Sequence, residues 1–164
     1  MFSELSPFTK LHVVISLIGI VSGLVVMFGL LIGRKLNGQT ALFLISTALT
    51  SVTGFFFPFH GVTPAIVVGI ISLIVLAVAI FARYARHLAG HWRWIYAATA
   101  MIALYFNIFV LIVQLFQKVP ALKALAPTQT EPPFAVTQLV VLALFVLLTI
   151  IAAIRFRGEQ LRMA

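Results

Sequence analysis

Five long stretches of the chain contain no Lys, Arg, Asp or Glu, and this feature constrains the fold more than any other. They cover residues 11–33, 39–59, 62–82, 94–117 and 134–154. A helix needs roughly 20 mostly apolar residues to cross the hydrocarbon core of a bilayer. All eleven basic and all three acidic residues fall outside these stretches. The sequence therefore predicts an all-α, polytopic transmembrane helical bundle of five spans in a single domain, residues 1–164.

Composition narrows the chemistry that such a bundle can perform. The chain is 63% hydrophobic and 9% charged, against roughly 25% charged residues in a soluble domain. Its acids are Glu4, Glu131 and Glu159, and it has no Asp and no Cys. Phosphate-binding glycine loops, H-E-x-x-H and G-x-S-x-G motifs are also missing from the sequence. We therefore expect no catalytic residues and no metal site, and the sequence favours a non-enzymatic protein.

The basic residues predict the orientation, because Lys and Arg are enriched in cytoplasmic loops. Three of them, Lys10, Lys118 and Lys123, fall on one side of the predicted spans. The other eight fall on the opposite side: Arg34, Lys35, Arg83, Arg86, Arg93, Arg155, Arg157 and Arg162. This distribution predicts an amino terminus outside and a carboxyl terminus in the cytoplasm, as in a bacterial inner-membrane protein. The net charge of +8 then faces anionic lipid headgroups, and no nucleic-acid partner is expected.

Polar side chains collect at the predicted outer ends of the spans. His12, His60, Gln114 and Gln138 lie at span ends, and Glu131 lies in the outer loop, 118–133. Polar groups at membrane depth are costly unless they find partners or water. Two interpretations stay open: ordinary interfacial residues, or the rim of a ligand pocket. Phe56 and Phe57 would supply an apolar wall to such a pocket.

The fourth span carries a polar and small-residue stripe that runs inward from this rim. Its members are three, four or seven residues apart and are Tyr96, Ala100, Ala103, Asn107, Gln114 and Lys118. Asn107 is the deepest strong hydrogen-bonding side chain of the stripe. We expect it either to bond Thr47, Thr50, Thr53 or Thr149 of another span, or to contact a ligand. The spacings Gly19 to Gly23 and Gly29 to Gly33 also predict close helix packing in the first span.

The outer loop has features of a lid over the rim. Pro120 can open a short helix and Pro127 can close it, while Pro132 and Pro133 stiffen the return into the last span. Such a lid would bring Glu131 towards His12 or His60 and form a latch. The alternative is a surface loop in the headgroup layer with Glu131 in water.

His87 and His91 are spaced like a metal-chelating pair on a helix. They lie among Arg83, Arg86 and Arg93, and Gly90 interrupts the helix that would align them. Aromatic and basic residues at a span boundary are typical of an anchor at headgroup level. We therefore interpret this segment as an anchor.

The segment ALYFNIFVLIVQLFQKVPALKALAPTQTEPPF, residues 103–134, resembles segments of small uncharacterised polytopic membrane proteins of proteobacteria. The resemblance covers about a fifth of the chain. It implies a bacterial inner-membrane location, and it implies no activity, cofactor or site residue.

Three functions remain as hypotheses. The first is a multi-pass protein that holds an apolar ligand or a partner helix in an outward-opening pocket. The second is a redox protein with b-type haem bound by His12 and His60, since imidazole is a usual axial ligand of haem. The third is an accessory subunit of a larger membrane complex, or a homo-oligomer, surrounded by membrane lipid.

Overall fold

The computed structural model describes residues 6–58 and 64–158, and the regular structure in these ranges is entirely helical. The helices are α1 (Pro7–Leu31), α2 (Asn37–Gly54), α3 (Pro64–Ile80), α4 (Trp92–Lys118), α5 (Pro120–Leu125) and α6 (Pro132–Gly158), with a π-turn, η1 (Phe81–Ala85), after α3. The all-α expectation is confirmed. The short helix expected after Pro120 is also present, as α5.

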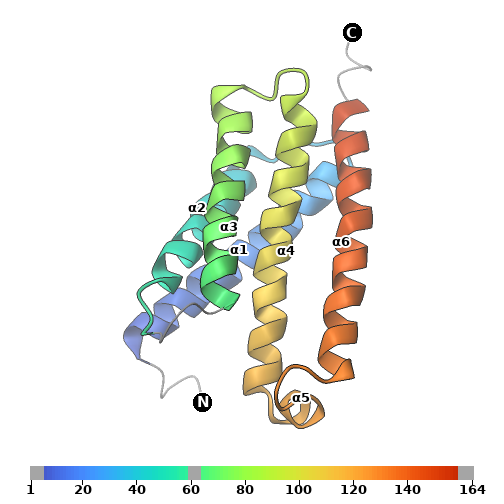
Figure 1. Ribbon diagram of the computed structural model, residues 1–164. Coiled ribbons are helices and arrows are strands. Elements are labelled where there is room, and N and C mark those ends of the chain that lie inside the picture. Colours follow the sequence, from blue (N-terminus) through green and yellow to red (C-terminus); the bar gives the residue numbers. More distant parts are fainter. Residues whose placement is uncertain (1–5, 59–63, 159–164) are drawn as a thin grey trace.

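The helices form a bundle in which successive long helices reverse direction. α3, α4 and α6 stand side by side, and α1 crosses them at a slant with α2 beside it (Figure 1). α1 begins at the lower end in this view, whereas α6 ends at the upper end. The largest fully buried side chains come from α2, α3, α4 and α6 and include Phe43, Leu76, Tyr96 and Phe156. The core therefore joins all four of these helices.

Local signals fix both ends of α1. The Ser6 hydroxyl accepts a hydrogen bond from the Thr9 backbone N–H at 3.2 Å, and Pro7 occupies the first turn, a favoured helix start. At the other end, the N–H groups of Gly33 and Arg34 bond the carbonyls of Leu30 and Gly29. Gly33 has a φ of 74°, which completes a Schellman motif. The spacing of Gly29 and Gly33 had suggested helix packing. Gly33 instead ends the helix.

Four helices are long and apolar enough to cross a membrane by length and composition: Pro7–Leu31, Ile66–Ala85, Trp92–Lys118 and Pro132–Phe156. α2 is not one of them. It has 18 residues, a length of about 27 Å at about 1.5 Å per residue, and it includes Asn37, Gln39 and six hydroxyl residues. The structure therefore supports a helical protein with four candidate spans, and a fifth crossing by α2 is a proposal.

Small and polar residues bring α1, α2 and α4 together. A Cβ atom added to Gly19 would lie 3.3 Å from the hydroxyls of both Ser46 and Thr47. Asn107 Nδ2 of α4 donates to Thr47 Oγ1 of α2 at 2.9 Å. Thr47 was one of the four partners expected for Asn107, so the predicted interhelical bond is confirmed. The Gly19–Gly23 spacing also lies on a closely packed face, as expected.

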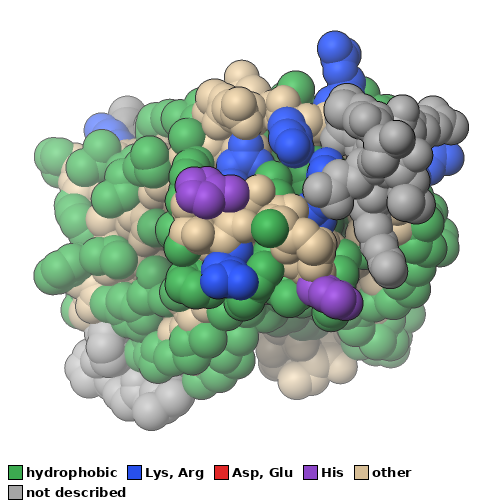
Figure 2. Space-filling model, turned by 90° about the horizontal axis from the view of Figure 1, so that it is seen from above, with side chains coloured by type: hydrophobic (Ala, Val, Ile, Leu, Met, Phe, Trp, Pro, Cys, Tyr) green, Lys and Arg blue, Asp and Glu red, His purple; other side chains and the backbone are tan. Residues whose placement is uncertain are grey.

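Basic side chains gather at the upper end of the bundle. Figure 2 shows this face, where Lys, Arg and His side chains lie among apolar ones and no acidic side chain is visible on its described part. Several arginines bind helix ends here. Arg93 Nε donates to the Phe156 carbonyl at 3.1 Å, and Arg155 Nη1 donates to the Leu31 carbonyl at 3.2 Å. A cation beside the last carbonyls of a helix is favourable, so these contacts tie α6 to α4 and α1.

Candidate functional site

A cavity of about 520 Å³ lies in the lower half of the bundle, between α1, α2, α3 and α4. Its volume falls within the roughly 300–1,000 Å³ of small-molecule sites. Most of its lining is apolar and includes Leu17, Ile20, Ile66, Val110 and Leu111. A few polar side chains interrupt this lining, at positions that the helical repeat of each element brings to one face.

α1 contributes a polar row to the cavity. Thr9, His12 and Ser16 are three and four residues apart, and all three line the cavity. His12 is half-buried, its Nδ1 lies 2.8 Å from Thr53 Oγ1 of α2, and its ring meets Phe57 edge-on at 4.9 Å. The Thr53 hydroxyl donates to the Leu49 carbonyl at 2.7 Å, so its oxygen accepts from Nδ1–H of His12. These contacts hold the imidazole in place, and Nε2 has no hydrogen-bond partner among residues 6–58 and 64–158.

The deeper polar groups come from α2, α3 and α4. Asn107, Thr50, Ser51 and Ser72 all line the cavity. Ser51 donates to Ser72 at 3.4 Å, whereas the buried hydroxyl oxygen of Thr50 has no hydrogen-bond partner among the described residues. Buried polar atoms are almost always paired with protein or water. The deeper part of the cavity is therefore lined by one amide and three hydroxyl side chains.

The end of α4 supplies the only charged side chain on the described lining. Gln114 and Lys118 follow Asn107 at helical spacing and both line the cavity. Lys118 lies close enough to His12 for its charge to act on the imidazole. These residues form the polar end of the cavity, and the remaining wall is largely apolar.

The structure brings together half of the residues that the sequence had singled out. His12, Asn107, Gln114 and Phe57 line the cavity. Phe56 does not, since 71% of its surface is exposed. Gln138 of α6 faces α4, where its Nε2 donates to the Phe109 carbonyl at 3.3 Å, and its buried Oε1 has no hydrogen-bond partner in the described part of the chain. His60 lies outside the described residues.

Glu131 is engaged within its own turn. Its carboxylate accepts hydrogen bonds from the Thr128 hydroxyl at 2.8 Å and from the backbone N–H groups of Thr128 and Thr130. Desolvation opposes the charged form, but these three bonds outweigh it and lower the pKa of Glu131. The described structure therefore shows a local turn in place of a latch to His12. A latch to His60 involves a residue outside the described ranges.

The connector nevertheless folds back onto the bundle. Ala126 is fully buried against Ile112 and Phe116 of α4. Gln129 Nε2 donates to the Val113 carbonyl at 2.9 Å. The lid-like connector therefore packs against α4 and the first turns of α6, and its described contacts do not reach across to α1.

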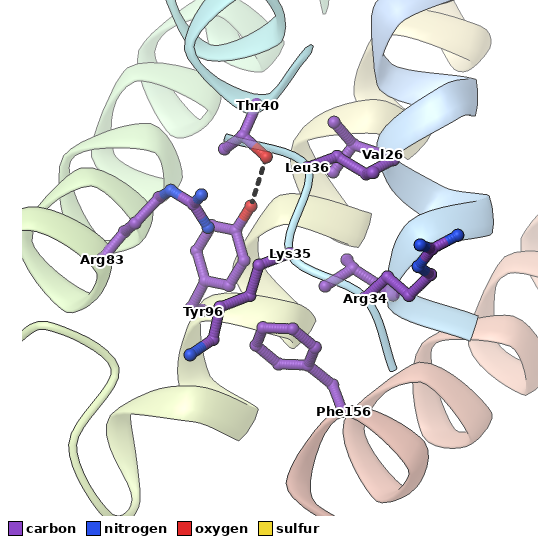
Figure 3. Close-up of a pocket in the computed structure, with 9 residues that line it drawn as sticks. Val26, Arg34, Lys35, Leu36, Thr40, Arg83, Tyr96 and Phe156 are labelled. Carbon is purple, nitrogen blue, oxygen red and sulfur yellow. Dashed lines mark hydrogen bonds between the residues drawn. The ribbon is translucent and has the colours of Figure 1, made fainter. Parts of the chain in front are cut away.

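A second cluster lies at the upper end, shown in Figure 3. Arg83 extends from η1 to Tyr96, and Tyr96 Oη donates to Thr40 Oγ1 at 3.3 Å. The Arg83 guanidinium donates to Asn37 Oδ1 at 2.6 Å and lies 5.1 Å from the centre of the Tyr96 ring. Phe156 closes the cluster from α6. The side chains pack tightly here, so we interpret this cluster as a structural contact that holds α2, η1, α4 and α6 together.

The helix needed for a histidine chelate does not form at the α3–α4 connection. His87 and Leu88 have φ angles of 49° and 58°, and His87 and His91 are both exposed. Arg86 instead lies 5.5 Å from the Trp92 ring. Among the described residues, no group of three or more potential metal ligands is found.

Sequence reasoning missed several cavity residues that carry a readable signal. Thr9 and Ser16 flank the predicted residue His12 at helical spacing, as the members of the α4 stripe flank one another. Lys118 was part of the predicted stripe and of the charge distribution, but it was not predicted to line a ligand site. Thr50 and Ser51 resembled ordinary helix hydroxyls that bond the preceding turn. Their approach to α3 and α4 depends on tertiary packing, which helical spacing does not reveal.

Comparisons with protein-family models, with curated proteins and with solved structures find no match for this chain.

Proposed function

We propose that this protein is a non-enzymatic, multi-pass inner-membrane protein that holds an apolar molecule in the cavity between α1, α2, α3 and α4. The single observation that carries the proposal is this cavity of about 520 Å³, whose mainly apolar wall includes isolated polar groups such as His12 and Asn107. Preformed apolar cavities with a few convergent polar groups are typical of ligand sites. The lining offers hydrogen bonds and the positive charge of Lys118, which can bind and orient a small molecule.

A small molecule suits this cavity better than a partner helix. One turn of an α-helix is about 5.4 Å long and about 10 Å across, so a single turn would fill most of the volume. A docking helix requires a groove that continues over several turns. We therefore favour a ligand, and a partner helix becomes an outcome of the tests.

The proposal includes a membrane topology of five crossings. α3 begins at the end of the bundle where α1 also begins, so α2 returns the chain between them (Figure 1). Its polar surface is partly covered, because Thr40, Ser46 and Thr47 are buried. With the basic end in the cytoplasm, the cavity opens towards the outer side of a bacterial inner membrane.

Filling the cavity tests the proposed function. Native mass spectrometry of the protein in mild detergent should detect a retained small molecule, which Val110→Trp should displace because Val110 lines the cavity. The control, Val146→Trp, adds the same side chain at a residue with 51% exposure on α6 and should retain the molecule. Both variants are first checked for cooperative thermal unfolding. Equal retention by the two variants, or a wild-type protein without any bound molecule, would overturn the proposal.

A further inference from the structure

The polar end of the cavity carries a net positive charge. Lys118 is exposed at the last position of α4 and lines the cavity together with His12. Among the described residues, the ammonium group of Lys118 forms no hydrogen bond or ion pair. Glu131, the one acid in the described ranges, is bonded to Thr128 and Thr130. The positive charge at this end is therefore not balanced by a carboxylate of the described chain.

The rest of the cavity has the opposite character. Leu17 and Ile20 on α1 and Val110 and Leu111 on α4 make this part of the wall mainly aliphatic, and the deeper polar side chains described above interrupt it. Phe55 packs against Gly69, where an added Cβ would lie 3.1 Å from Phe55 Cζ, and both residues line the cavity. Burial of apolar ligand surface here is favourable, at about 25 cal/mol per Å².

The two ends together define the shape of a ligand. Lys118 lies where α4 ends. A lysine at the end of a span can extend its ammonium group into the headgroup region. Because Nδ1–H of His12 donates to Thr53, Nε2 of the neutral ring is an acceptor, so Lys118 and not His12 supplies the donor for an anionic group at this end. A ligand that fills this space has its charge at the interface and its apolar part within the bundle.

We propose that the ligand of this cavity is a single-chain amphiphile with an anionic head, a carboxylate or a phosphate monoester, whose head pairs with Lys118 and whose chain occupies the apolar cavity. This inference rests on the proposed function and adds the charge and the form of the ligand. A charge-assisted hydrogen bond from Lys is roughly twice as strong as a neutral one. A hydrogen bond from Lys118 would therefore favour an anionic head over a neutral or cationic head on the same chain.

Four probes with one chain test the charge: oleate, oleyl phosphate, oleyl alcohol and oleylamine. Their affinities for the full chain in nanodiscs of neutral phospholipid are measured by displacement of a fluorescent fatty acid. We expect at least one anion to bind about tenfold more tightly than the alcohol, in line with the strength of hydrogen bonds to charged groups. The tighter of the two anions identifies the head group.

Matched lysine variants assign the preference to its source. Lys118→Gln should remove the tenfold difference, whereas Lys123→Gln removes the same charge from the exposed helix α5 and should preserve it. Equal binding of the alcohol and both anions, or tighter binding of the amine, would overturn the anionic head while the proposed function stands. If none of the four probes binds the wild-type protein, and the Val110→Trp variant retains as much bound molecule as the wild type, both the anionic head and the proposed function are overturned.

Discussion

Gly23 shows how little space separates α1 from its neighbours. A Cβ atom at this position would lie 2.6 Å from Leu104 Cδ1 and 2.8 Å from Phe43 Cε2. Overpacking of a core costs about 1–3 kcal/mol, so Gly23→Val should lower the free energy of unfolding by that amount. Thermal or denaturant unfolding in detergent measures the change.

Gly38 provides the control for Gly23. A Cβ atom at Gly38 meets nothing within 4 Å, so Gly38→Val should change the stability by no more than about 0.5 kcal/mol, as at other surface sites. Equal losses for the two variants would contradict the close packing of α1 against α2 and α4.

The bond between Asn107 and Thr47 is suited to a double-mutant cycle. Asn107→Leu, Thr47→Val and the double variant are compared by unfolding in the same detergent. Interhelical hydrogen bonds of this kind average about 0.6 kcal/mol and reach about 1.7 kcal/mol, and the coupling free energy should lie in that range. A coupling free energy indistinguishable from zero would show that the 2.9 Å contact does not stabilise the bundle.

Single residues also show where sequence reasoning stops. The partner of Asn107 could be narrowed to four threonines because helical spacing and depth restrict the choice. The burial of Arg83 and Arg93, at 8% and 4% exposure, could not be predicted in the same way. The enrichment of Lys and Arg in cytoplasmic loops predicts the side of the membrane, but it does not predict which side chains fold back onto a neighbouring helix.

At the scale of elements, the apolar stretches locate the five long helices and leave their ends uncertain by a few residues. α1 begins at Pro7 and α6 at Pro132, because proline is favoured in a first turn. The connector after α4 was harder to predict. Its prolines indicate the short helix α5, but the side of the bundle on which it packs depends on Ala126 and Gln129, whose contacts with α4 are tertiary.

The turn around Glu131 predicts a pH dependence of this connector. The pKa of the Glu131 carboxyl is lower in the folded protein than in the unfolded chain. The carboxylate therefore stabilises the fold above its unfolded-state pKa, and this stabilisation is lost as the pH falls through its folded-state pKa. The amide resonances of Thr128 and Thr130, followed by NMR, should therefore titrate with a midpoint below that of a free glutamate side chain. Glu131→Gln should remove this titration. A midpoint at or above the free value would contradict the observed hydrogen bonds.

At the scale of the whole molecule, the unequal charge of the two ends predicts the topology. A reporter that is active only in the cytoplasm should function when fused after residue 164 and fail when inserted near Pro127. The reason is the eight-to-three distribution of Lys and Arg over the two sides. The reverse pattern would place the cavity on the cytoplasmic side and contradict the outward opening.

The central claim is that a small molecule occupies the cavity in the membrane, and photo-crosslinking in living cells tests it most directly. Benzoylphenylalanine replaces Leu111, whose side chain lines the cavity, and the irradiated protein is analysed by intact-mass spectrometry. Our account predicts an adduct of lipid-like mass that is lost when Val110→Trp is added. An adduct with a second protein, or no adduct at Leu111, would contradict it.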